Sequence, residues 1–234
     1  MKIIAATACF TWARPLFGLI FLTLAACAQL QPQPRAVVFD FGPGALVGSS
    51  GSSGPAGSAM AASARMAPLP TLVLADVEAP AALDSTAVLY RLGYSDAHQL
   101  RPYTQARWSM APAQLVRQRL REQLGLHRTV LQAAQGVGSA KPAVTLHLEL
   151  DEFSHWFATA DSSSGLVRMR ATLAQPDGGV ERLLAQQSFV VQRPASSADA
   201  AGGVRALTLA TDALIQELEQ WVEQAEQRAK SMGW

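Results

Sequence analysis

The stretch Val144-Thr-Leu-His-Leu-Glu-Leu-Asp151 alternates apolar and polar residues at every step. Its aliphatic residues occupy the even-numbered positions and its polar residues the odd-numbered ones. Because successive side chains of a β-strand point to opposite faces, this pattern predicts a strand with one buried face and one face in water. The sheet that contains this strand is therefore expected to be covered on one side.

The residues that follow this strand predict a β-hairpin. Residues 166–173 repeat the alternation, and residues 180–192 again place apolar side chains on one face. Between these two runs lies Gln175-Pro-Asp-Gly-Gly179, whose proline, aspartate and glycines are typical turn residues. The second half of the sheet is therefore expected to be antiparallel.

Upstream of residue 144 the strand signals are shorter. Residues 71–77 form a nearly continuous apolar run, which favours a strand buried on both faces, and residues 87–94 are also β-prone. Residues 129–132 could add a short strand. Residues 96–103 are polar and lack a clear period, so they are predicted to be an irregular connection.

Two segments carry helical periodicity. The first begins at Pro112 and ends before Gly125, with apolar residues at three- and four-residue spacing, and the second spans residues 203–228 with a similar apolar stripe. Helices and strands do not alternate regularly, which argues against a doubly wound fold. The predicted fold is therefore α+β, with an antiparallel or mixed β-sheet and two main helices packed on one face.

The N-terminal residues predict a secretory signal peptide over residues 1–26. Lys2 and Arg14 precede a short apolar run, which ends in Leu24-Ala-Ala-Cys27. Leu24, Ala25 and Ala26 resemble a bacterial lipobox, which implies that Cys27 is acylated with fatty chains, palmitate among them. An ordinary signal with a chance cysteine, or an N-terminal transmembrane anchor, are the alternatives. Ala28 stands where an inner-membrane retention signal usually has Asp, which implies the periplasmic face of the outer membrane.

Composition divides the rest of the chain. Residues 27–35 are rich in Gln and Pro and predict a tether, and residues 36–41 predict a first strand. Residues 42–68 consist mostly of Gly, Ser, Ala and Pro, which is typical of a linker or loop. Residues 69–231 are expected to form the main domain.

Charge and cysteine content exclude some classes of function. Loss of Lys2 and Arg14 with the signal changes the formal net charge from +1 to −1, so nucleic acid is not the expected partner. Cys9 is also lost, which leaves Cys27 alone and allows no internal disulfide. Stability is therefore expected to come from burial and backbone pairing.

No catalytic, metal or cofactor site is predicted. His147, Glu149 and Asp151 share one strand face, but side chains two apart on an open strand diverge, and charges on a wet face are ordinary. The sequence contains no Gly-x-Ser-x-Gly elbow and no phosphate-binding loop. A cell-wall hydrolase using paired carboxylates stays open as a distant alternative.

Two groups of residues are candidate contacts with a partner or a lipid. Arg117 and Arg121, with Arg119, are predicted to lie mostly on the outer face of the first helix, as a solvated face or as a patch for headgroups or an acidic partner. Trp156 and Phe157 follow the clearest strand and are expected to emerge into a loop, where they could line a lipid groove, or to fill the core.

Several phrases, in this order, resemble the auxiliary lipoproteins of ABC-type transport systems. They are Leu72-Val-Leu-Ala-Asp-Val77, Val88-Leu-Tyr-Arg91, Leu146-His-Leu-Glu-Leu-Asp-Glu-Phe153 and Glu219-Gln-Trp221, and they follow the lipobox. The resemblance covers about residues 37–222. The stretch 42–68 is longer than expected between the first two strands of that family.

The resemblance implies an α+β domain held at the inner leaflet of the outer membrane, with no enzymatic activity of its own. It implies docking to an MCE-domain protein of an envelope lipid transport system, with phospholipid as a further candidate ligand and a homo-oligomer that matches a ring of MCE subunits. A general structural envelope lipoprotein without a transport role is the alternative.

Overall fold

The structure, a computed structural model, describes residues 35–44, 69–132, 143–177 and 179–231. The signal peptide, the lipobox residues Leu24, Ala25 and Ala26, and Cys27 lie outside the described residues, as does most of the predicted linker. The chain divides after Arg35, and the unit Ala36–Trp234 contains every described helix and strand.

The described residues form one mixed sheet of eight strands. The strands are β1 (Val37–Phe39), β2 (Leu69–Glu78), β3 (Ala87–Leu92), β4 (Asp96–Trp108), β5 (Arg128–Gln132), β6 (Val144–Phe157), β7 (Ser163–Asp177) and β8 (Val180–Pro194). Two α-helices, α2 (Pro112–Leu124) and α4 (Ala200–Ser231), and the short 3₁₀ helix η3 (Ala81–Leu83) complete the domain.

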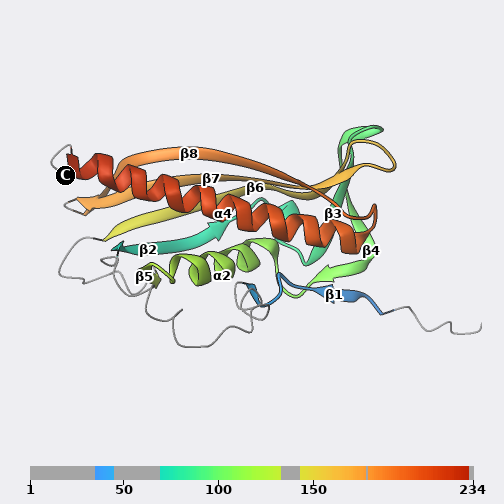
Figure 1. Cartoon of the computed structure of the whole chain (residues 1–234), viewed down its shortest axis with the longest axis horizontal. Helices are drawn as coiled ribbons and strands as arrows, with labels where there is room; N and C mark the ends of the chain where they lie inside the picture. The colour runs from blue at the N-terminus through green and yellow to red at the C-terminus, as the bar shows by residue number, and fades with distance from the viewer. Residues whose placement is uncertain (1–34, 45–68, 133–142, 178, 232–234) are drawn as a thin grey trace, which may run out of the picture. The chain divides into compact units, whose positions relative to one another are not determined.

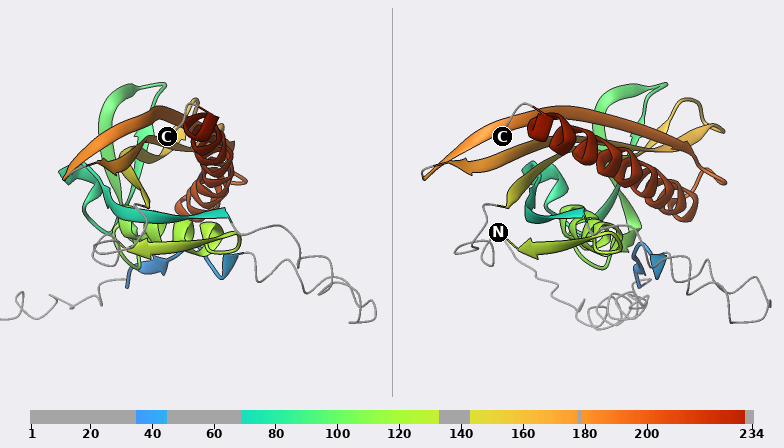
Figure 2. Two further views of the ribbon diagram at one scale, coloured as in Figure 1. Left: turned by 90° about the vertical axis from the view of Figure 1, so that its left-hand side faces the viewer. Right: turned by 60° about the vertical axis from the view of Figure 1, so that its left-hand side comes forward.

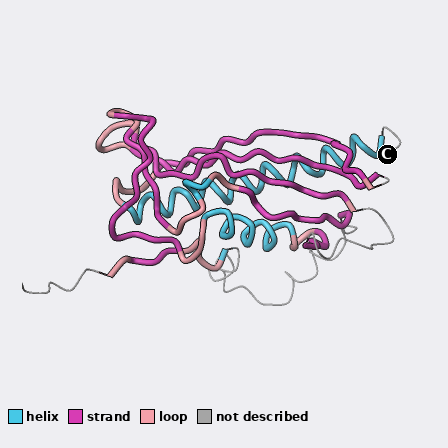
Figure 3. Tube along the Cα trace, turned by 180° about the vertical axis from the view of Figure 1, so that it is seen from behind, coloured by secondary structure: helices cyan, strands magenta, loops and turns pink. Residues whose placement is uncertain are grey.

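Both α-helices lie on one face of the sheet, which confirms the predicted α+β class. Helix α4 runs along β7 and β8 and also contacts β6, while α2 packs on β2 and β5 and touches α4 (Figure 1). The view from behind in Figure 3 shows the long strands passing in front of α4. Figure 2 shows how strongly the sheet curves around that helix.

Strand β6 is the centre of the sheet because it has three neighbours. Along one edge it pairs antiparallel with β7, which continues the predicted hairpin into β8. Along its other edge it pairs parallel with β2 and then, closer to its end, with β3. The break at η3 separates these two strands, so the sheet divides into a β2–β5 branch and a β3–β4–β1 branch.

A β-bulge changes which side chains of β6 are buried. The pairing with β7 skips one residue between Leu150 and Glu152, so the even-numbered buried positions give way to Phe153, His155 and Phe157. The strand thus runs to residue 157. The prediction that Trp156 and Phe157 emerge into a loop is wrong, because both lie within β6.

A second correction concerns residues 96–103, which belong to strand β4 and not to an irregular connection. Most side chains of β4 before Ala106 are exposed or half-buried, so the strand has no apolar face that a sequence pattern could reveal. It is held by backbone pairing to β3 on one edge and to β1 on the other.

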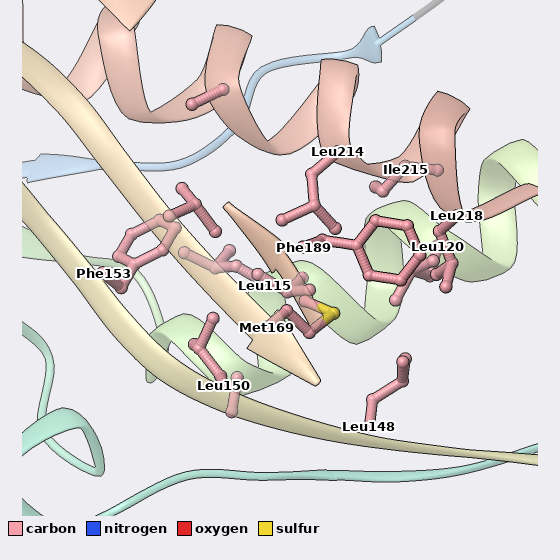
Figure 4. Packing of buried hydrophobic residues seen from close by; sticks show 14 of the residues in the cluster. Leu115, Leu120, Leu148, Leu150, Phe153, Met169, Phe189, Leu214, Ile215 and Leu218 are labelled. Atoms are coloured by element: carbon pink, nitrogen blue, oxygen red, sulfur yellow. The ribbon is translucent and has the colours of Figure 1, made fainter. Parts of the chain in front are cut away.

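The interior lies between the sheet and the two helices. Figure 4 shows side chains from five elements gathered there, among them Leu150, Met169, Phe189, Leu120 and Leu214. All of these side chains are at most 3% exposed. Full burial of one such side chain contributes about 1.5–3 kcal/mol, so this interior supplies the main stabilisation of a domain that was predicted to lack a disulfide.

Candidate functional site

Helix α2 has one face in the core and one in solvent, and its outer face carries the candidate site. Apolar residues at four-residue spacing, Val116, Leu120 and Leu124, are completely buried against the sheet. The outer face follows the spacing i, i+3, i+4, i+7, i+8. Its members are Gln114, Arg117, Gln118, Arg121 and Glu122.

These five side chains and Met110 line a groove of about 610 Å³. A neighbouring pocket of about 270 Å³ shares Met110, Gln118 and Glu122 with the groove and reaches Phe41, in the residues that follow β1. The structure thus brings the predicted contact residues Arg117 and Arg121 together in one depression. Its lining combines the thioether of Met110, the amides of Gln114 and Gln118 and three charged side chains.

Two guanidinium groups and the carboxylate of Glu122 line the groove, and Glu122 lies 3.8 Å from Nη1 of Arg119. Arg117 forms an ion pair with Asp76 of β2, with 2.9 Å between Nη1 and Oδ1. Arg121 is exposed and makes no ion pair within the part of the chain that the structure describes, so its guanidinium is available for a carboxylate or phosphate.

Arg119 does not belong to the outer face, contrary to the prediction. Its side chain is 4% exposed and donates to Asp212 of α4, with 2.8 Å between Nε and Oδ1. Its Nη2 also donates to the carbonyl oxygen of Phe41 at 3.0 Å. The burial has a physical reason: a carboxylate from the second helix compensates the charge. Arg119 therefore ties α2, α4 and the residues after β1 together beneath the candidate groove.

Trp156 and Phe157 do not line the groove. Trp156 covers Gly93, where an added Cβ atom would overlap the indole ring. Phe157 is buried on the opposite face of β6 and packs edge-on against Tyr90, with 6.1 Å between the ring centroids. Of the two interpretations that the sequence left open for this pair, core packing fits Phe157.

A buried pair next to the start of α4 is the most perturbed titratable site. The hydroxyl of Tyr103 lies 2.9 Å from Nδ1 of His155. Burial lowers the pKa of His155 to about 4, although the nearby charge of Asp199 opposes this shift. Burial, followed by the charges of Tyr90 and Asp199, raises the pKa of Tyr103. At neutral pH His155 is therefore uncharged and a weak base, which suits packing better than proton transfer.

The polar face of β6 contacts polar and charged side chains of β7 and β8. His147 lies 3.0 Å from Glu181 of β8, and Arg170 of β7 lies 3.1 Å from Glu149 and 3.9 Å from Asp151. Among the residues that the structure describes, no group of three or more His, Cys, Asp or Glu side chains could hold a metal ion. A search of the same residues finds no helix long and apolar enough to cross a membrane.

Sequence reasoning missed four of the six groove residues: Met110, Gln114, Gln118 and Glu122. A usable signal was present, because these residues, apart from Met110, share with Arg117 and Arg121 the i, i+3, i+4 spacing of one helix face. Met110 precedes the helix, and its place in the groove depends on how β4 enters α2, which no periodicity encodes.

Comparison with known proteins identifies the family. The model of the family described as "ABC-type transport auxiliary lipoprotein component" matches residues 53–219. A search of curated proteins found no matching sequence. The fold is similar to that of protein XCC0632 from Xanthomonas campestris, with 20% identity and a TM-score of 0.59, covering 69% of this chain and 88% of that one.

Protein CT253 from Chlamydia trachomatis is also similar, with 10% identity and a TM-score of 0.46, over 66% of this chain and 95% of that one. The family match spans well over half of the sequence, and the mixed sheet with two helices agrees with the related solved fold. This chain belongs to the family of ABC-type transport auxiliary lipoprotein components.

Proposed function

We propose that this protein is a non-enzymatic, lipid-anchored accessory of an ABC-type envelope lipid transport system, which docks the periplasmic MCE-domain component of that system. The family match over residues 53–219 is the observation that carries the proposal. The α2 groove, as the proposed docking surface, and the lipobox, as the proposed site of the anchor, are consistent with it.

The anchor in this proposal is Cys27, which is acylated, becomes the first residue of the mature chain, and is inserted in the inner leaflet of the outer membrane. Each buried methylene contributes about 0.8 kcal/mol, so several chains on one residue make the attachment effectively permanent. Replacement of Cys27 by Ser removes the acceptor sulfur. Membrane fractionation should then find the protein in the soluble periplasmic fraction, and an unchanged outer-membrane location would contradict the proposed anchor.

The α2 groove is the proposed docking surface for the MCE-domain protein. Arg121, which has no ion pair among the described residues, and Arg117 present guanidinium groups to an acidic segment of the partner. A phospholipid headgroup has the same anionic chemistry and is the second candidate ligand of the groove. The domain itself is proposed to form a homo-oligomer that matches a ring of MCE subunits, and light scattering of the purified protein tests this.

Crosslinking in intact cells, followed by affinity purification of the tagged full-length chain and mass spectrometry, tests the proposal. Recovery of an MCE-domain or ABC component is the expected result. Arg121→Glu should reduce that recovery several-fold, because it reverses the charge of the free guanidinium. Arg168→Glu is the matched control, since Arg168 is also exposed but lies on β7, outside the groove. Equal losses in both variants would contradict docking at α2.

A general structural envelope lipoprotein is the competing function. Recovery of cell-wall or outer-membrane assembly proteins alone, with no MCE or ABC component, would favour it. Release of soluble fragments from purified cell wall by the wild-type chain would contradict the non-enzymatic assignment.

A further inference from the structure

Strand β8 leaves one long edge of the sheet without a neighbour in the described part of the chain. It pairs along its whole length with β7, and the structure shows no other strand beside it. The other two branches of the sheet end in β5 and β1, which have five and three residues, whereas β8 has fifteen. The backbone N–H and C=O groups on this edge are therefore the largest unused pairing surface of the domain.

This edge lacks the features that normally prevent strand addition. Residues 183–192, Leu-Leu-Ala-Gln-Gln-Ser-Phe-Val-Val-Gln, contain no charge, proline or glycine. Edge strands that must stay single usually carry lysine, proline or other interruptions. The edge of β8 is therefore open to an added strand over ten consecutive residues.

Two apolar side chains on the outer face of β8 are left in water. Leu183 is 59% exposed and Val190 is 61% exposed. The register with β7 skips Leu184, so Leu183 shares the outer face with Gln186, Ser188 and Val190 despite its odd number. An added strand with apolar residues at matching positions would cover both.

We propose that the occupant of this edge is a second copy of the same strand, paired antiparallel about a two-fold axis at Gln187. Gln187 is the midpoint of Val180–Pro194, so this register uses nearly all of β8 in both copies. With the skip at Leu184 kept, Leu183 of each copy lies opposite Val190 of the other. The Leu183–Val190 pair then occurs twice in the dimer, as an isologous interface requires.

The charges at the two ends of β8 disfavour parallel pairing. Glu181 stands near the start, beside Arg182, which is itself 3.6 Å from Asp177, and Arg193 stands near the end. In the antiparallel register Glu181 lies on the outer face with Leu183 and Arg193 lies on the other face, so these two side chains do not meet. Parallel pairing would place Glu181 beside Glu181 and Arg193 beside Arg193, which is unfavourable. This inference rests on the sheet edge and does not depend on the proposed transport function. The closed two-fold dimer is an alternative to the ring-matching homo-oligomer proposed above, and the mass in light scattering distinguishes the two.

Cysteine crosslinking of the full-length chain in intact cells tests the register. Gln187→Cys places two sulfurs on directly opposite residues, about 4.5–5.5 Å apart between Cα atoms, within reach of a disulfide. A dimer band on a non-reducing gel is expected. Gln192→Cys should give none, because its two copies lie about 34 Å apart along the paired strands. Co-expression of the Glu181→Cys and Gln192→Cys chains should restore the dimer band.

The unsubstituted chain controls for Cys9 and Cys27. Absence of the Gln187→Cys dimer, or an equally strong dimer from Gln192→Cys alone, would overturn the register. A crosslinked species whose mass differs from two copies would overturn the choice of occupant and identify a foreign strand.

A charge placed on the edge tests the interface without cysteines. Val190→Lys should abolish the dimer in light scattering of the full-length protein in mild detergent, because two lysines would face Leu183 of the opposite copies. Val38→Lys is the matched control: Val38 is 63% exposed, also on an edge strand, but on β1. A dimer that survives Val190→Lys, or that Val38→Lys weakens as much, would contradict the proposal.

Discussion

Gly203 and His155 form a contact whose energetic coupling can be measured. Gly203 lies in the first turn of α4, directly over the imidazole of β6. A Cβ atom on Gly203 would lie 2.5 Å from Cγ and 3.0 Å from Cβ of His155. Real Cβ atoms do not approach other carbons this closely, so the helix would have to move away from the sheet.

Two opposing terms set the expected size of the effect. Gly→Ala inside a helix is worth about 1 kcal/mol through intrinsic propensity. Overpacking in a well-packed interior costs about 1–3 kcal/mol, and this contact is at the tight end because the neighbouring atoms lie close to the His155 backbone. Gly203→Ala should therefore lower the free energy of unfolding by about 2 kcal/mol at neutral pH.

The sign should change when the imidazole is removed. In a His155→Ala background Gly203→Ala should be neutral or stabilise by up to about 1 kcal/mol, because only the 3.0 Å contact with Cβ remains. Urea unfolding of all four chains gives the coupling energy. A Leu173→Ala background is the control: it opens a cavity far along β7 and should leave the cost of Gly203→Ala unchanged. An equal cost in the His155→Ala and wild-type backgrounds would refute the reasoning.

Three further predictions follow from buried or capping groups. The pKa of His155, about 4 in the folded chain against 6.5 in the unfolded chain, predicts that the unfolded state binds more protons between these values. The free energy of unfolding should therefore rise by about 3 kcal/mol from pH 4 to 6.5. Urea unfolding of the His155→Leu variant at several pH values should show a free energy of unfolding without this rise. Arg128 and Glu226 form a buried ion pair: their side chains are 0% and 5% exposed, and 2.8 Å separates Nη1 from Oε1. Glu226→Leu alone should lower the free energy of unfolding by about 3–5 kcal/mol, because it leaves Arg128 buried without a counter-charge. The double variant Arg128→Met/Glu226→Leu should have a urea midpoint close to that of the unsubstituted chain. Asp199 accepts from the backbone N–H of Gly202 at 2.7 Å, so Asp199→Ala should cost about 1 kcal/mol in thermal unfolding, and Asp199→Asn should keep most of the cap.

The periodicity of the sequence predicted the helices and strands that bury one face in the core and leave the other in water. The alternation in β6, β7 and β8 and the apolar stripes of α2 and α4 arise because one face of each element meets the core. The same logic failed for β4, whose first ten side chains are all exposed or half-buried, so its strand conformation depends on its neighbours.

The bulge in β6 explains the other miss. Alternation breaks at Leu150-Asp-Glu-Phe153, and that break suggested that the strand ends there. The strand continues because one skipped residue returns Phe153 and Phe157 to the buried face. Sequence alone does not distinguish a bulge from a strand end, since both interrupt the period.

Part of the candidate groove could be predicted and part could not. Arg117 and Arg121 are on the outer face of α2 as expected from helical spacing. Arg119 could not be assigned correctly from local pattern, because the carboxylate that allows its burial, Asp212, lies 93 residues away in sequence.

Helix α4 supplies the carboxylates for both buried arginines, Arg119 and Arg128, and the second of these pairs joins residues 98 positions apart. Until α4 has been synthesised, collapse of the preceding residues would bury two guanidinium groups with no counter-charge, at a cost of several kcal/mol each. Without α4, the faces of β7 and β8 that this helix contacts would also stay exposed to water. We therefore expect a nascent chain to stay unfolded through most of its elongation. Completion of α4, rather than of any early segment, then sets the moment at which this domain folds.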